Sequence, residues 1–137
     1  MTIAPLLLFN NCVEYVPIKN VTRMVPALVR GVYALYMEDK QGNMNCVYVG
    51  MASIGKTQGA GARLLDHANK KSGQWTHCSV FEAWDNLSDL QIRELEGIIR
   101  HIYAKDKNTN RLCKQKTYKP ISRICRKNRN DWLGHPS

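Results

Sequence analysis

The sequence lacks several features that mark common protein classes. No apolar stretch approaches the roughly 20 residues of a membrane-spanning helix. The opening MTIAPLLLFNNC has neither the basic segment nor the small-residue cleavage site of a signal peptide. The five cysteines are odd in number and form no CxxC pair, which argues against a disulfide framework or a zinc knuckle. We therefore expect a soluble, cytoplasmic protein with reduced thiols and no membrane contact.

Acidic side chains are scarce relative to basic ones. The 137 residues include 20 Lys+Arg and 11 Asp+Glu, which gives a formal net charge of +9. Residues 111-129 alone carry eight basic side chains and no acidic one. This balance favours a polyanionic partner, either nucleic acid or an anionic membrane surface.

Two segments rich in β-branched and aromatic residues are typical of strands. GVYALYM and NCVYVGM flank the polar, glycine-containing turn EDKQGN, so together they predict a β-hairpin. A turn centred on Gln41-Gly42 would set Tyr33 opposite Gly50. Tyr48 would then lie two positions along on the same face, within reach of the Tyr33 ring.

The remaining elements follow from similar patterns. WTHCSVFEAWD predicts a third strand, and ARLLDHANKK predicts a short helix in which Arg63 and His67 share a face. Ser88 is a suitable N-cap for the long amphipathic segment DLQIRELEGIIRHIYAK. The sequence therefore predicts an α/β (α+β) fold with a small three-stranded antiparallel sheet flanked by helices.

The chain length fits one domain with extensions at both ends. Prolines at positions 5, 17 and 26 interrupt the apolar N-terminal segment and are incompatible with a long helix or a central strand. We expect residues 1-30 to be an extension packed on the domain, residues 31-113 to be the domain itself, and residues 114-137 to be a basic C-terminal extension.

One glutamate of the long helix falls on its apolar stripe. On a helical wheel Glu96 lies beside Ile92 and Ile99, whereas Glu94 points to the opposite side. An ionised carboxylate on a buried face is costly unless a cation or hydrogen-bond donors meet it. A structural ion pair with an Arg or Lys is one explanation, and a functional carboxylate is the other.

These residues and their order resemble the GIY-YIG endonuclease superfamily. The matching features are GVY at 31-33, YVG at 48-50, Arg63 on the next helix and Glu96 on the one after it. The resemblance covers about residues 30-113. It implies a small antiparallel sheet with flanking helices, and hydrolysis of DNA phosphodiester bonds with one divalent metal ion, Mg²⁺ or Mn²⁺.

The resemblance also implies a role for each matching position. Tyr33 and Tyr48 would position or activate the attacking water, and Arg63 would hold the scissile phosphate. His67 would assist proton transfer, and Glu96 would be the metal ligand. A tyrosine is a poor base at neutral pH unless nearby cations lower its pKa from about 10, so the general base is either Tyr48 or His67.

Two further positions follow from the resemblance. An asparagine about a dozen residues beyond the glutamate closes the site in many members, and here Asn110 is the preferred candidate, with Asn108 the alternative. Many members carry a lysine directly after the second motif, where this chain has Met51. We expect Lys56, in the longer glycine-rich loop of this chain, to supply that charge.

The basic C-terminal segment is the predicted DNA-tracking surface. Its candidate phosphate contacts are Lys116, Lys119, Arg123, Arg126 and Lys127. The predicted partner is duplex or branched DNA, with a homodimer or a protein partner as a further expectation. The alternative function is a nucleic-acid-binding module of the same fold with weak or no catalysis.

Overall fold

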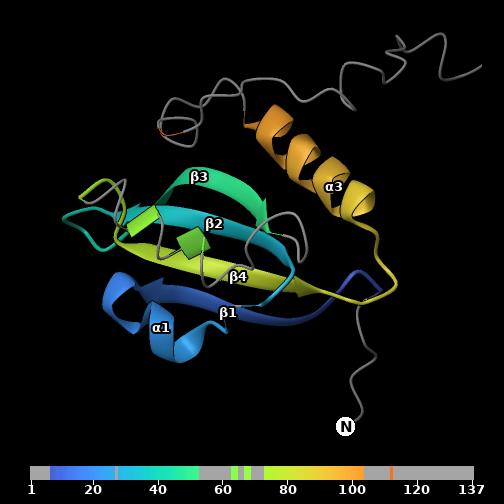
Figure 1. Cartoon of the computed structure of the whole chain (residues 1–137). Helices are drawn as coiled ribbons and strands as arrows, with labels where there is room; N and C mark the ends of the chain where they lie inside the picture. The colour runs from blue at the N-terminus through green and yellow to red at the C-terminus, as the bar shows by residue number, and fades with distance from the viewer. Residues whose placement is uncertain are drawn as a thin grey trace, which may run out of the picture.

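The described part of the chain has an α+β fold in which helices flank one antiparallel sheet (Figure 1). The computed structural model describes residues 7-26, 28-52, 63-64, 67-68, 73-103 and 112. The sheet has four strands in the order β1-β4-β2-β3, so β1 and β3 are its edges. In chain order, the elements are β1 (Phe9–Pro17), the 3-10 helix η1 (Ile18–Asn20), α1 (Val21–Met24), β2 (Gly31–Glu38), β3 (Met44–Ala52), β4 (His77–Ala83) and α3 (Asp89–Ile102).

The expectation of a three-stranded sheet was wrong, because the N-terminal segment supplies a fourth strand. β1 pairs antiparallel with β4, from Phe9 opposite Ala83 to Pro17 opposite His77. Proline is tolerated at this place because it is the last residue of an edge strand. The pairing shifts register twice, and Tyr15 has a positive φ of 54°. These irregularities break the alternating pattern by which a strand is recognised in a sequence.

The β2–β3 hairpin confirms the register expected from the sequence. Tyr33 lies opposite Gly50, and Leu35 lies opposite Tyr48. The turn is closed by the carboxylate of Asp39, which accepts hydrogen bonds from the backbone N–H groups of Gln41 (2.9 Å) and Asn43 (2.8 Å). The chain reverses at Gly42, whose φ of 85° favours glycine.

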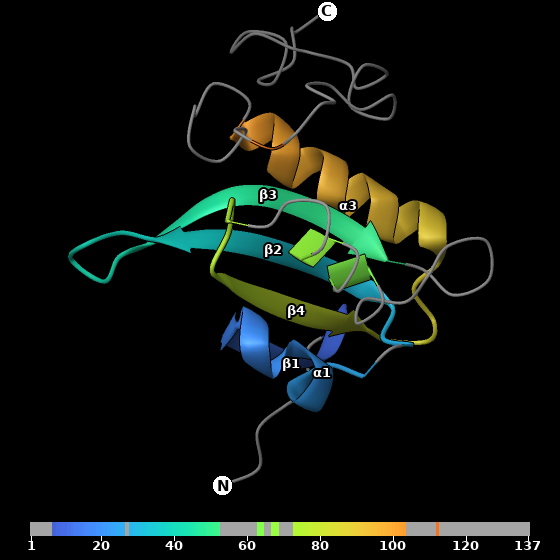
Figure 2. The same cartoon turned by 60° about the vertical axis from the view of Figure 1, so that its left-hand side comes forward.

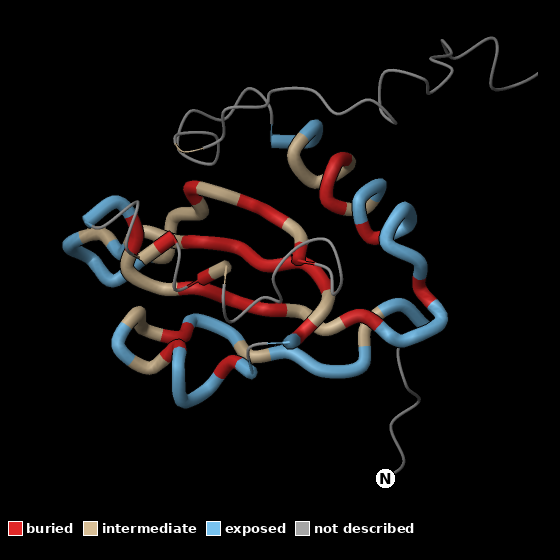
Figure 3. The backbone as a smooth tube through the Cα atoms, in the orientation of Figure 1, coloured by how far each residue is buried: buried red, intermediate tan, exposed pale blue. Residues whose placement is uncertain are grey.

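Alternating residues of β2 serve two apolar clusters, one on each face of the sheet. Tyr33 and Leu35 belong to the larger cluster, together with Leu64 and Trp75. Val32 belongs to the second cluster, into which α3 packs. Figure 3 shows buried residues concentrated along the inner strands β2 and β4 and at spaced positions along α3. Apolar side chains therefore cover both faces of the sheet. The GVY and YVG motifs lie on the two strands of the β2–β3 hairpin.

α3 begins as the sequence predicts. Gln91 N donates to the Ser88 side chain (3.2 Å), and Ser88 N donates to the Gln91 side chain (2.8 Å), which forms a capping box. Turned by 60°, the molecule shows α3 running alongside β3 (Figure 2). Ile92 and Glu96 are buried against the sheet, whereas Glu94 is exposed. Across the described segments, no helix has the length and apolar character required to cross a membrane.

Candidate active site

Tyr33 is the centre of the candidate site. Its side chain is fully buried on β2, and its hydroxyl lies 2.8 Å from Nε2 of His67. Arg63 Nε donates a hydrogen bond to the same hydroxyl oxygen at 3.4 Å. Burial, followed by the neighbouring Tyr48, raises the pKa of Tyr33 far above its usual range, and Arg63 offsets this in part. Tyr33 is therefore a neutral phenol near neutral pH.

The aromatic rings of Tyr33, Tyr48 and His67 lie close to one another. Tyr33 and Tyr48 are stacked, with ring centroids 6.0 Å apart and planes 26° apart. The His67 ring lies 5.1 Å from the Tyr48 ring and 5.7 Å from the Tyr33 ring. Tyr48 is half-buried, so of the two motif tyrosines it is the one that remains in contact with solvent. The hairpin register brings the two rings together, as the sequence predicts.

The glycines of both motifs are required by close packing. A Cβ on Gly50 would lie 2.7 Å from the Tyr33 Cζ and hydroxyl and 2.7 Å from Tyr48 Cε1. A Cβ on Gly31 would collide with the carbonyl oxygen of Phe81 on β4. Gly50 thus allows the two tyrosines to stack against their own hairpin, and Gly31 allows β2 to approach β4.

Arg63 and His67 lie in helical conformation, as expected for the segment after the glycine-rich loop. Arg63 is half-buried and His67 is buried. The charge of Arg63 acts both on Tyr33 and on Glu96, lowering the pKa of each. Arg63 contacts the tyrosine cluster directly through Tyr33, whereas on the carboxylate of α3 it acts only through its charge.

Glu96 is a buried carboxylate beside this cluster, with 5% of its surface exposed. Burial raises its pKa, while the charges of Arg100, Arg93 and Arg63 lower it in that order. Its Oε1 forms an ion pair with Nη2 of Arg100 at 3.0 Å. The wheel argument is therefore confirmed: Glu96 is buried, Glu94 is not, and a cation meets the buried carboxylate.

Arg100 is the site residue that we did not predict from the sequence. Besides Glu96, it contacts the second motif directly: its Nε donates to the carbonyl oxygen of Val49 at 2.8 Å. Its guanidinium carbon lies 5.3 Å from the centroid of the Tyr48 ring. The available signal was its spacing, since a basic residue four positions after a glutamate shares its helix face.

The described residues offer a single buried carboxylate, that of Glu96, as a candidate metal ligand. Among the described residues there is no group of three or more His, Cys, Asp or Glu side chains that could enclose a metal. Mg²⁺ commonly keeps several waters and takes one or two carboxylates from the protein. Glu96 supplies one such carboxylate, and its ion pair with Arg100 engages one of its two oxygens.

The other predicted site residues lie outside the described part of the chain. They are Asn110 with its alternative Asn108, Lys56, Lys116, Lys119, Arg123, Arg126 and Lys127. Their roles remain predictions. The described residues thus bring together Tyr33, Tyr48, Arg63 and His67, with Glu96 joined to them through arginines.

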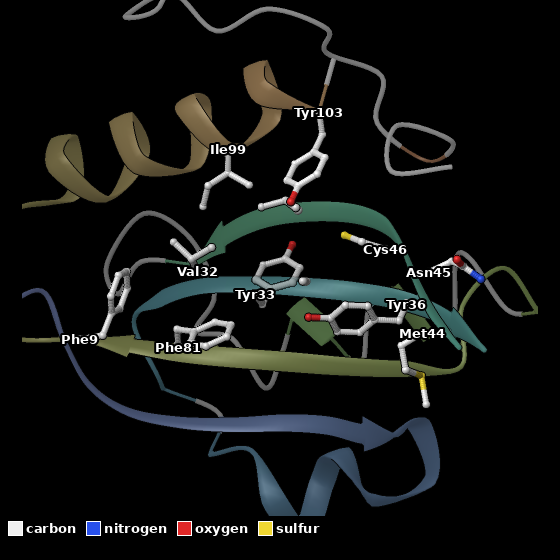
Figure 4. A pocket seen from close by; sticks show the side chains of 12 residues that line it. Phe9, Val32, Tyr33, Tyr36, Met44, Asn45, Cys46, Phe81, Ile99 and Tyr103 are labelled. Atoms are coloured by element: carbon white, nitrogen blue, oxygen red, sulfur yellow. The ribbon is translucent and has the colours of Figure 1, made fainter. Parts of the chain in front are cut away.

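An apolar groove lies between α3 and the sheet. Its volume is about 560 Å³, and Figure 4 shows Ile99 of α3 and Tyr103, directly after this helix, above Phe9 and Phe81 of the sheet. Tyr33 belongs both to the groove lining and to the candidate site. The groove lacks the carboxylate and the arginines of the site, so it offers apolar contact rather than acid–base or phosphate chemistry.

No protein-family model, curated protein or solved structure matches this chain. Interpretation of the site therefore depends on its own side chains: two stacked tyrosines, a histidine, a carboxylate and arginines.

Proposed function

We propose that the protein is a metal-dependent DNA endonuclease of the GIY-YIG type, which hydrolyses phosphodiester bonds with one divalent metal ion. The observation that carries this proposal is the convergence of Tyr33, Arg63 and His67 through a shared hydroxyl, with Glu96 buried nearby. The net charge of +9 suits a polyanionic substrate. We place this activity in the cytoplasm.

Phosphodiester hydrolysis requires an oriented water and neutralisation of the charge that develops on the phosphate. Arg63 supplies the neutralising group in this proposal. Its guanidinium is half-buried, so it is held by Tyr33 yet remains accessible to a phosphate. A planar guanidinium matches two phosphate oxygens at once, which a lysine does not.

Tyr48 is the tyrosine that we assign to the attacking water. Tyr33 is fully buried and carries a raised pKa, so it neither meets solvent nor ionises readily. Tyr48 retains solvent contact and stacks on Tyr33. In this scheme Tyr33 holds Arg63 and His67 in place, and Tyr48 orients the water.

His67 is the nearby side chain whose imidazole can accept a proton in this scheme. Arg63 donates to the Tyr33 oxygen, which also lies within hydrogen-bond distance of Nε2 of His67, where donor and acceptor depend on the histidine tautomer. Glu96 would hold the metal ion, which when bound supplies Lewis-acid stabilisation of the phosphate charge.

Incubation of the purified protein with supercoiled plasmid tests the proposal. We expect nicked and linear products with Mg²⁺ or Mn²⁺, and intact plasmid with EDTA. Cleavage that persists in EDTA would contradict a metal-dependent mechanism.

One observation favours a second candidate, a nucleic-acid-binding module without turnover. The carboxylate of Glu96 is already paired with Arg100, as in a purely structural ion pair. A protein that binds DNA with strong salt dependence, yet leaves the plasmid intact in every divalent metal ion, would support this alternative.

A further inference from the structure

Within the described part of the chain, Arg100 makes three interactions that involve the candidate site. It pairs with Glu96 through Nη2 (3.0 Å), donates from Nε to the carbonyl of Val49 (2.8 Å), and lies over the ring of Tyr48 (5.3 Å). Val49 stands between Tyr48 and Gly50, so the accepting carbonyl belongs to the YVG motif itself. The Arg100 side chain is largely buried, with 11% of its surface exposed.

We propose that Arg100 is a positioning residue for the proposed nuclease reaction: it ties α3 to β3 so that Glu96 and Tyr48 are held in one fixed arrangement. This inference rests on the proposed function for its catalytic meaning. Its geometric content, that one guanidinium orients both side chains, can be tested separately.

The guanidinium group is suited to this task. Its Nε and Nη2 point to two different acceptors, one on the backbone of β3 and one on the side chain of Glu96. Its flat face can at the same time lie over an aromatic ring. A lysine carries the same charge on one nitrogen, so it cannot reproduce this planar arrangement.

A second arginine makes similar interactions without touching the site. Arg30 pairs with Asp89 at the start of α3 (3.2 Å) and donates to the carbonyl oxygen of Trp84 (2.9 Å). Arg30 therefore also joins α3 to the segment that directly follows β4. Arg30 is a matched control, because a merely structural role for Arg100 would predict the same consequences from both substitutions.

The contrary interpretation is that Arg100 blocks Glu96 by occupying its carboxylate. In that case its removal would free the ligand and strengthen metal binding. If Arg100 positions Glu96, its removal weakens metal binding; if Arg100 blocks Glu96, its removal strengthens metal binding. A measurement of metal affinity therefore separates the two roles without any need for DNA cleavage.

The test compares Arg100→Met, Arg100→Lys and Arg30→Met with the wild-type protein. The first measurement is Mn²⁺ binding by calorimetry in the absence of DNA, and the second is the NMR signals of the Tyr48 ring. Residues that orient a metal ligand typically contribute about 10- to 100-fold to affinity or activity. We expect a loss of this size for Arg100→Met, with altered Tyr48 ring signals.

The other two variants complete the test. We expect Arg100→Lys to recover little, because it keeps the charge and loses the geometry, and to lower kcat for cleavage more than it raises KM for DNA. Arg30→Met should lower thermal stability yet keep wild-type Mn²⁺ affinity and Tyr48 signals. If Arg100→Met does not fold, Arg100→Lys supplies the same measurements.

Three results would overturn the inference: tighter Mn²⁺ binding in either Arg100 variant, unchanged Tyr48 signals, or equal effects from Arg30 and Arg100. Failure of the proposed function looks different. A wild-type protein that neither cleaves DNA nor binds Mn²⁺ would refute the nuclease, while the Tyr48 signals would still show whether Arg100 positions the tyrosine.

Discussion

The Tyr33 hydroxyl lies 2.8 Å from Nε2 of His67, although the two residues are 34 positions apart in the sequence. The same hydroxyl accepts a hydrogen bond from Arg63. One buried phenol on the first hairpin strand thus fixes two residues of the segment that follows the glycine-rich loop. This relationship joins the GVY motif to the Arg63 and His67 pair, which the sequence connects by order alone.

Tyr33 should give the protein an alkaline limit of stability. Its pKa is raised in the folded state, whereas in the unfolded chain a tyrosine ionises near pH 10. Above that pH the unfolded chain releases this proton first, so stability falls as pH rises, and the contribution is fully present below it. Urea unfolding at about pH 8 and about pH 11 should show a smaller decrease in stability for Tyr33→Phe than for the wild-type protein. Equal decreases would mean that the buried phenol does not govern this limit.

The two motif glycines should respond differently to alanine. In Gly50→Ala the new methyl group meets tyrosine side chains, which can shift at a cost of about 1–3 kcal/mol for overpacking. In Gly31→Ala it meets the Phe81 backbone, which is held in the sheet. We therefore expect a folded Gly50→Ala protein with disturbed Tyr33 and Tyr48 ring signals, and a larger loss of stability in Gly31→Ala. Chemical denaturation with NMR checks both, and the reverse order of stability would refute the packing argument.

Arg63→Ala should lower turnover by about two to three orders of magnitude, since a group that stabilises developing charge acts mainly in the transition state. The control is Arg23→Ala on α1, which removes the same charge from an exposed position. Single-turnover kinetics at saturating DNA separate a loss of turnover from a loss of DNA affinity. A loss of affinity with unchanged turnover would count against Arg63 as a catalytic residue.

The hairpin register, the Ser88 cap and the burial of Glu96 could be predicted because each depends on local rules. The turn residues fix which side chains face each other, and the wheel fixes which glutamate is buried. β1 could not be predicted, because it is irregular and pairs with residues of β4 that lie 60 or more positions away in the sequence. The hydrogen bond from Arg100 to Val49 likewise joins residues 51 positions apart, a tertiary relationship that helix spacing alone does not show.

Burial along the apolar stripe of α3 ends before the helix does. Ile92 and Leu95 follow the pattern and pack against the sheet, whereas Ile102 is 69% and Tyr103 is 46% exposed. The apolar pattern predicts the direction in which a side chain points. The side chain is buried only where the sheet extends far enough to cover it. At the end of α3 the apolar groove lies beside Tyr103 instead.

The basic C-terminal segment should supply salt-dependent affinity rather than chemistry. Charge reversal at Arg126 and Lys127, which lie outside the described residues, should weaken DNA binding and flatten the slope of log K against log salt. Removing one phosphate-neutralising charge reduces that slope by about 0.9 on duplex DNA. Binding titrations at several salt concentrations check this. A folded double variant with the wild-type slope would show that these two charges do not meet DNA.

The most direct test of the central claim is plasmid cleavage by a matched pair of variants, Glu96→Gln and Glu94→Gln. The two glutamates lie two residues apart on α3, one buried beside Arg100 and Tyr48, and the other exposed. With Mg²⁺ present, we expect Glu96→Gln to bind DNA but leave the plasmid intact, because the metal ligand is gone, and Glu94→Gln to cleave at the wild-type rate. Normal cleavage by a folded Glu96→Gln protein, or its loss in Glu94→Gln alone, would contradict the account.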